Sequence, residues 1–71
     1  MGTMTKTFTN GYCEIATSDF GMSIKPTALV MTPCNQIIVM RYDYDGSSNS
    51  IVKVYVGNNY SGLLRFCYWV K

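Results

Sequence analysis

The sequence contains no histidine and only four acidic residues. It therefore lacks the side chain that most often acts as a general base near neutral pH, which is also the most common transition-metal ligand. Asp43 and Asp45 would share one strand face, but a pair of catalytic carboxylates also needs a cleft, which 71 residues can hardly build. Cys67 lies near Arg65 but has no histidine to activate it as a nucleophile. We expect a non-enzyme with no catalytic residue, no cofactor and no metal site.

Cysteine is scarce, with three residues at Cys13, Cys34 and Cys67. An odd number cannot all pair within one chain, and none belongs to a C-x-x-C motif, so neither a disulfide framework nor a zinc site is predicted. No apolar run reaches the roughly 18 residues of a membrane span, and the opening MGTMTKTFTNGY has no hydrophobic region of signal-peptide type. We expect a cytoplasmic protein with reduced thiols and no membrane association, in which Cys13 faces the core and Cys67 faces outward.

Charged residues are also sparse, at 14% of the chain, and the net charge is only +2. This falls short of the basic balance of proteins that bind duplex nucleic acid through phosphates, although it leaves room for a local patch. With 48% hydrophobic residues, the chain is predicted to be one globular domain over residues 1–71. A domain of this size buries only about 60% of the surface that its unfolded chain exposes, so its core alone stabilises it weakly. Since neither disulfides nor a metal are predicted, contact with a partner chain is the expected source of further stability.

The pattern that is present is an alternation of polar and apolar residues with a period of two, which is typical of strands. Thr3 to Thr9 and Tyr12 to Ser18 flank Asn10-Gly11, a strong signal for a type I′ hairpin. A two-residue loop would pair the two runs as Phe8–Cys13, Lys6–Ile15 and Met4–Thr17. Asp19-Phe20-Gly21 is predicted to turn the chain, Met22 to Lys25 is a possible short strand, and Ala28 to Met31, between Pro26 and Pro33, is predicted to be a buried strand.

The second half is predicted to be a three-stranded meander of residues 36–45, 51–56 and 63–71. A five-residue loop sets Asp43 opposite Lys53, where opposite charges stabilise the pair. The same register pairs Arg41–Tyr55, Tyr42–Val54 and Met40–Val56, and, across the second loop, Val54–Phe66 and Val52–Tyr68. The last strand could lie at the sheet edge, where unpaired backbone groups invite a second copy.

This register divides the meander into two faces. The predicted core face consists of Ile38, Met40, Tyr42, Tyr44, Val52, Val54, Val56, Leu64, Phe66, Tyr68 and Val70. The predicted outer face consists of Ile37, Val39, Arg41, Asp43, Ile51, Lys53, Tyr55, Leu63, Arg65, Cys67, Trp69 and Lys71. An antiparallel sheet normally has one polar side, so the apolar residues among these charges need an explanation.

Two explanations of the outer face remain open. The N-terminal hairpin could cover part of it, giving a small all-β antiparallel barrel or sandwich of five to six short strands. Alternatively it is an interface, because contact between chains typically buries tryptophan, tyrosine and arginine together. The interface residues would be Ile37, Arg41, Lys53, Tyr55, Tyr60, Leu63, Arg65, Trp69 and Lys71.

Nucleic acid is the alternative partner, because Arg41, Lys53, Arg65 and Lys71 could follow phosphates while aromatic rings stack on bases. A further alternative is a nucleotide-like ligand held between identical subunits by Tyr60, with Asn58, Asn59 and the basic residues. In its size, its strand-rich sequence and its lack of catalytic groups, the chain resembles small proteins, often from phages, that bind and block a larger host protein. We therefore expect a homo-oligomer, a dimer or larger, that acts by protein–protein contact.

Overall fold

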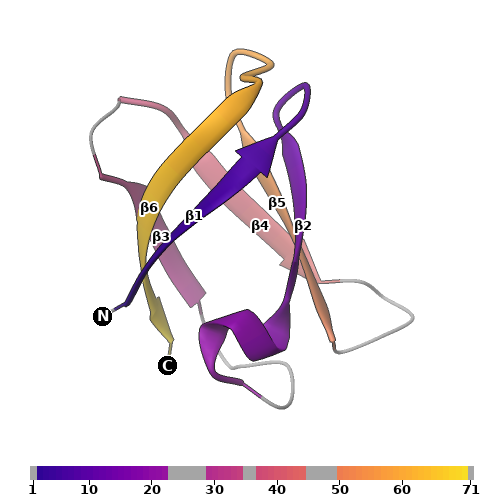
Figure 1. Cartoon of the computed structure of the whole chain (residues 1–71), viewed down its shortest axis with the longest axis vertical. Coiled ribbons are helices and arrows are strands. Elements are labelled where there is room, and N and C mark those ends of the chain that lie inside the picture. The colour runs from indigo at the N-terminus through magenta and orange to yellow at the C-terminus, as the bar shows by residue number, and fades with distance from the viewer. Residues whose placement is uncertain (1, 23–28, 35–36, 45–49, 71) are drawn as a thin grey trace.

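The computed structural model describes residues 2–22, 29–34, 37–44 and 50–70 of the chain. These residues form an all-β structure in which one short 3-10 helix follows the second strand (Figure 1). The elements are β1 (Gly2–Phe8), β2 (Tyr12–Ala16), η1 (Thr17–Phe20), β3 (Leu29–Pro33), β4 (Met40–Tyr44), β5 (Ile51–Val56) and β6 (Gly62–Val70).

The six strands form two antiparallel sheets of three strands each. Sheet A has the order β1–β6–β3, and sheet B has the order β2–β5–β4. In the part of the chain that the structure describes, the two sheets do not close into a barrel. Gly2 pairs with Tyr68, so both ends of the described chain lie at the same end of sheet A, as Figure 1 shows.

The turn at Asn10-Gly11 is confirmed. Both residues have positive φ, at 51° and 77°, and the flanking Thr9 and Tyr12 exchange two backbone hydrogen bonds of 3.0 Å. These are the conformations that a type I′ turn requires, which is why the sequence Asn-Gly suits this position.

The hairpin predicted around this turn is wrong beyond the Thr9–Tyr12 bridge. β1 pairs with β6 and β2 pairs with β5, so the expected pairs Phe8–Cys13, Lys6–Ile15 and Met4–Thr17 do not form. The turn is held instead by the β5–β6 connection: the Gly11 amide donates to the Tyr60 carbonyl, and the Val56 amide donates to the Gly11 carbonyl. It is therefore a corner at which the chain passes from one sheet to the other.

The predicted register between β4 and β5 is confirmed. The structure pairs Asp43 with Lys53, Arg41 with Tyr55, Tyr42 with Val54 and Met40 with Val56. The predicted register between β5 and β6 is wrong, because β5 lies between β2 and β4 whereas β6 lies between β1 and β3. Val54 and Phe66 therefore belong to different sheets, and β6 is a central strand rather than an edge.

The middle of the chain largely follows the sequence. Leu29–Pro33 is a strand at the edge of sheet A, where a proline is tolerated. Leu29 and Met31 are buried as predicted, but the prediction of burial is wrong for Val30, which faces outward and is exposed. Asp19-Phe20-Gly21 turns the chain as predicted, with Gly21 at φ 76° after the 3-10 helix. The possible strand at 22–25 and Pro26 lie mostly outside the described residues, as do Gln36, Asp45 and Lys71.

One hydrophobic core is shared by the inner faces of both sheets. Its buried hydrophobic residues are Phe8, Ile15, Phe20, Leu29, Met31, Val52, Val54, Val56, Leu64 and Phe66. The predicted core residues Val52, Val54, Val56, Leu64 and Phe66 are all among them. The half-buried residues Ile38, Met40, Tyr42, Tyr44 and Tyr68 pack against it, and so does Cys13.

Val70 is the exception among the predicted core residues, with 40% of its surface exposed. In the described part of the chain, β1 pairs with β6 only as far as Tyr68, whereas β3 also pairs with Trp69 and Val70. Val70, in the last described pair at this end of β6, is partly in solvent.

We expect Phe66→Ala to lower the free energy of unfolding by about 3–5 kcal/mol, because it removes a fully buried ring that packs edge-on against Phe8. Val70→Ala is the matched control and should cost less than about 1 kcal/mol, because its side chain is already partly exposed. Urea denaturation followed by circular dichroism measures both values. Equal midpoints for wild type and Phe66→Ala would show that Phe66 is not in the core.

Three glycine variants test the corner at Gly11. A Cβ at Gly11 would meet the Val56 carbonyl oxygen at 2.7 Å with φ at 77°, whereas a Cβ at Gly21, at φ 76°, would contact nothing. We expect Gly21→Ala to cost about 1–2 kcal/mol through its backbone conformation alone, Gly11→Ala to cost more, and Gly57→Ala, which has neither problem, to cost least. If Gly11→Ala and Gly21→Ala had equal unfolding midpoints, the corner contact with β5 would be absent.

Candidate interaction surfaces

The residues predicted to form one binding surface lie on the outer faces of two different sheets. Leu63, Arg65 and Trp69 are on β6 in sheet A, whereas Arg41, Lys53 and Tyr55 are on β4 and β5 in sheet B. Because the core lies between the inner faces, these two groups point away from each other. The single outer face of a meander, on which the site prediction was based, does not exist in this structure.

The remaining predicted site residues belong to neither sheet face. Ile37 is fully exposed ahead of β4. Tyr60 lies between β5 and β6, where its hydroxyl donates a hydrogen bond of 2.6 Å to the Leu63 carbonyl oxygen, so it fastens the start of β6. Lys71 lies outside the described residues.

The outer face of sheet A, here called the β6 face, carries exposed apolar side chains. Leu63 is 67% exposed, Val30 49% and Trp69 37%, and Val30 lies directly opposite Trp69 in the β3–β6 register. The register places nine residues on this face: Thr3, Thr5, Thr7, Val30, Thr32, Leu63, Arg65, Cys67 and Trp69. Arg65 is the only charged residue among these nine.

Threonines lie along one side of the β6 face because β1, rather than β2, is the neighbour of β6. Thr3, Thr5 and Thr7 alternate along β1 and pair with Cys67, Arg65 and Leu63. The sequence prediction missed Val30 and these threonines as members of the surface, since it paired β1 with β2. The alternation of threonine was visible in the sequence, but nothing local identified the strand that lies beside it.

The outer face of sheet B is charged and balanced. Lys53 on the central strand lies opposite Glu14 on one side and Asp43 on the other. A second row across the same face contains Tyr12, Tyr55 and Arg41, in which the rings of Tyr12 and Tyr55 are 5.2 Å apart and the Arg41 guanidinium lies 4.3 Å from the centre of the Tyr55 ring. Most charged and aromatic side chains on this face therefore have an opposite charge or a ring beside them within sheet B.

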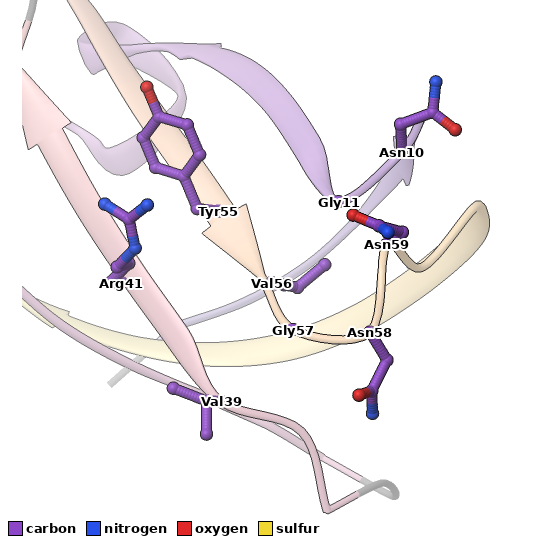
Figure 2. Close-up of a pocket in the computed structure, with 9 residues that line it drawn as sticks. All are labelled: Asn10, Gly11, Val39, Arg41, Tyr55, Val56, Gly57, Asn58 and Asn59. Atoms are coloured by element: carbon purple, nitrogen blue, oxygen red, sulfur yellow. The ribbon is translucent and has the colours of Figure 1, made fainter.

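A pocket of about 330 Å³ lies beside this second row (Figure 2). It is bounded by the Asn10-Gly11 corner and by the turn after β5, in which Asn58 and Asn59 both have positive φ. Its lining residues are Asn10, Gly11, Val39, Arg41, Tyr55, Val56, Gly57, Asn58 and Asn59. Figure 2 shows the Arg41 guanidinium beside the Tyr55 ring at one side of the pocket.

The pocket is lined by the Arg41 guanidinium, by the side-chain amides of asparagines and by glycine backbone, and these groups suit a small anionic ligand. It offers little to a stacking base, because Arg41 and Tyr12 flank Tyr55 on its two neighbouring strands. Asn58 and Asn59, which the sequence analysis considered as ligand contacts between subunits, line this pocket of the single chain, whereas Tyr60 does not.

A second cavity, of about 350 Å³, lies where the edges of the two sheets approach each other at β3 and β4. Its lining residues are Leu29, Val30, Met31, Met40, Arg41 and Tyr42. The Tyr42 hydroxyl accepts a hydrogen bond of 3.0 Å from the Leu29 amide, so a side chain joins the two edges here.

The acidic residues are dispersed over the described part of the chain. Glu14 accepts a hydrogen bond of 2.6 Å from the Tyr12 hydroxyl, Asp19 pairs with Lys6 at 2.9 Å, and Asp43 accepts from the Tyr44 amide. Among residues 2–22, 29–34, 37–44 and 50–70, no three side chains of histidine, cysteine or acidic type are grouped as metal ligands. The same ranges contain no helix that is long and apolar enough to span a bilayer.

Comparison with known proteins gives no relative. No family model, no curated protein and no solved structure matches this chain.

The Arg41–Tyr55 contact should be measurable as a coupling energy. A double-mutant cycle with Arg41→Ala and Tyr55→Leu, read by urea denaturation, should give about 0.5–1 kcal/mol of interaction at this partly exposed site. A cycle on Arg65 and Thr5, which are also cross-strand neighbours but have no ring, is the control and should give less. If the first cycle gave no coupling, the Tyr55 ring would be free to contact a ligand.

Proposed function

We propose that this chain is a non-enzymatic binding protein that acts through contacts with other protein chains, and that its first partner is a second copy of itself. One observation carries this proposal: the β6 face exposes Val30 and Trp69 at one end of β6 and Leu63 at the other, and Arg65 is the only charge among its described residues. Exposed apolar patches on small proteins typically mark contact sites.

The composition of the β6 face fits a contact between proteins better than a contact with nucleic acid. Interface centres are depleted in charge and enriched in tryptophan and arginine, which contribute a large share of binding energy. A nucleic-acid surface needs several cations to follow the phosphates, whereas Arg41 and Lys53 lie on the other sheet, away from Arg65.

Size supports self-association. A single core in a chain of 71 residues stabilises the fold only marginally, and covering the β6 face would add burial that one copy cannot provide. β6 is central in sheet A, so both of its edges are already paired with neighbouring strands. The proposed contact is therefore on the face of β6 and not the edge-to-edge pairing expected from the sequence. Two-fold pairing is the commonest arrangement of identical chains, and we propose a dimer.

The proposal extends to a larger protein as an additional partner, with the chain acting as an inhibitor in the manner of small phage proteins that block a host protein. The β6 face would serve that contact as well. We also propose a cytoplasmic location, with which the free thiols at Cys13, Cys34 and Cys67 are compatible.

A small anionic or nucleotide-like ligand is the second candidate, because the pocket beside Arg41 falls at the lower end of the size range of small-molecule sites. In that case Arg41 would contact the anion, and the amides of Asn10, Asn58 and Asn59 would orient it. The ring contacts of Tyr55 make this candidate the weaker of the two.

Size-exclusion chromatography with light scattering tests the dimer directly. We expect a wild-type mass of twice 8.0 kDa at micromolar concentration, and a mass near 8.0 kDa for Leu63→Asp and Trp69→Asp, which place a charge in an apolar contact. Ala16→Asp, an exposed position on the outer face of sheet B, is the control and should stay dimeric. A monomeric wild type would contradict the self-association proposal.

Salt dependence separates protein partners from nucleic acid. Burial of apolar surface is not screened by ions, so the dimer should persist when the salt concentration is raised, whereas binding to phosphates weakens steeply. We expect no tight binding to single-stranded DNA or RNA at physiological salt in a fluorescence-anisotropy titration. Sub-micromolar binding that is lost in high salt and in Arg65→Ala would make nucleic acid the partner instead.

A further inference from the structure

We propose that Cys34 and Cys67 form a reversible dithiol–disulfide site that is oxidised by small-molecule disulfides. Their sulfur atoms lie 3.2 Å apart, although the residues are 33 positions apart in the sequence. A disulfide bond requires about 2.05 Å between the sulfurs, so each needs to move by well under 1 Å for the bond to form. This inference does not rest on the proposed function, although Cys67 belongs to the β6 face and the proposed dimer would therefore lie over the site.

The two thiols are brought together by the pairing of β3 with β6. Thr32 lies opposite Cys67, and just past the end of β3 the Cys34 amide donates a hydrogen bond of 3.0 Å to the Arg65 carbonyl. Cys34 therefore continues the register for one residue and lies diagonal to Cys67 on the same outer face, where side chains of neighbouring strands meet.

In a single copy of the chain, both thiols are accessible to a small oxidant because both residues are only partly buried. Cys13 is also partly buried, but it lies in sheet B, where it packs against the core and pairs with Val54, and not beside Cys67 in sheet A. Burial is the main cause that raises the pKa of the Cys13 thiol above its ordinary value, which keeps it protonated and slow to react.

The two sulfurs share one hydrogen bond, in which either thiol can be the donor. The hydrogen bond with Cys67, and then burial, raise the pKa of the Cys34 thiol, whereas the positive charge of Arg65 acts in the opposite direction. Whichever thiol first loses its proton is already beside the second sulfur that completes the bond.

The reaction is a pair of thiol–disulfide exchanges with glutathione disulfide or a similar oxidant. One of the two cysteines, as its thiolate, attacks one sulfur of the oxidant, forming a mixed disulfide and releasing one glutathione thiolate. The other cysteine, on losing its proton, then attacks the first cysteine's sulfur, forming the Cys34–Cys67 bond and releasing the second glutathione. Two electrons pass to the oxidant, and the two protons of the protein thiols end on the two released glutathione molecules.

Mass spectrometry on the full chain tests this site. Reduced protein is incubated with excess glutathione disulfide, the remaining thiols are alkylated, and the bonded peptides are mapped. We expect a single alkylated cysteine, Cys13, and a peptide pair that joins Cys34 to Cys67, with all three thiols recovered after dithiothreitol. The oxidised form should also melt at a higher temperature than the reduced form, because the bond constrains the unfolded chain.

Cysteine variants provide the controls. Cys13→Ser should form the same bond at the same rate, whereas Cys34→Ser should stop at a mixed disulfide with glutathione on Cys67. The rate of the second step should not depend on protein concentration, and the bond should also form in Leu63→Asp, which is expected to be monomeric. Alkylation of all three cysteines, a bond to Cys13, or a Cys67–Cys67 bond between chains as the main product would overturn the proposal.

Discussion

Two turns that hold each other determine how this chain folds. At Asn10-Gly11 the chain passes from β1 in sheet A to β2 in sheet B, and between Val56 and Gly62 it passes from β5 in sheet B to β6 in sheet A. The Gly11 amide donates to the Tyr60 carbonyl at 2.8 Å, and the Val56 amide donates to the Gly11 carbonyl at 2.9 Å, so each turn completes the hydrogen bonds of the other. Only glycine suits this position, because a Cβ would lie 2.7 Å from the Val56 oxygen.

The surfaces follow from this crossing. It separates β5 from β6, and with them the charged and aromatic residues that alternate along the second half of the chain. Sheet B receives Lys53, Tyr55 and Arg41, whose neighbours in the sheet are acids and rings. Sheet A receives Leu63, Arg65 and Trp69, whose neighbours are threonine and valine. The charges and rings of one outer face thereby have neighbours within their own sheet, whereas the other face exposes Val30, Leu63 and Trp69.

The sequence predicted the features that depend on neighbours along the chain. The side of each strand that faces the core follows from alternation, so Val52, Val54, Val56, Leu64 and Phe66 were identified correctly. The β4–β5 register followed from the opposite charges of Asp43 and Lys53 across one connection.

The pairing of strands that are distant in the sequence could not be predicted in the same way. Asn-Gly specifies a tight turn, but the turn does not determine how far the two flanking strands stay paired with each other. Here they pair only at the Thr9–Tyr12 bridge. β1 lies beside β6 because both bury an apolar face over the same core, which is a property of the whole chain. For this reason the residues predicted to form one site lie on two different sheets, and the contact between Cys34 and Cys67 was not predicted.

The central claim is that the protein binds through the β6 face and not through sheet B. Amide chemical shifts measured by NMR over a dilution series of the wild-type chain test it most directly, because they report every strand at once. We predict that concentration-dependent shifts gather at Val30, Leu63 and Trp69, while Arg41 and Lys53 stay unchanged. Shifts that gather on β2, β4 and β5 would contradict the claim, and so would shifts that do not change with concentration on either sheet.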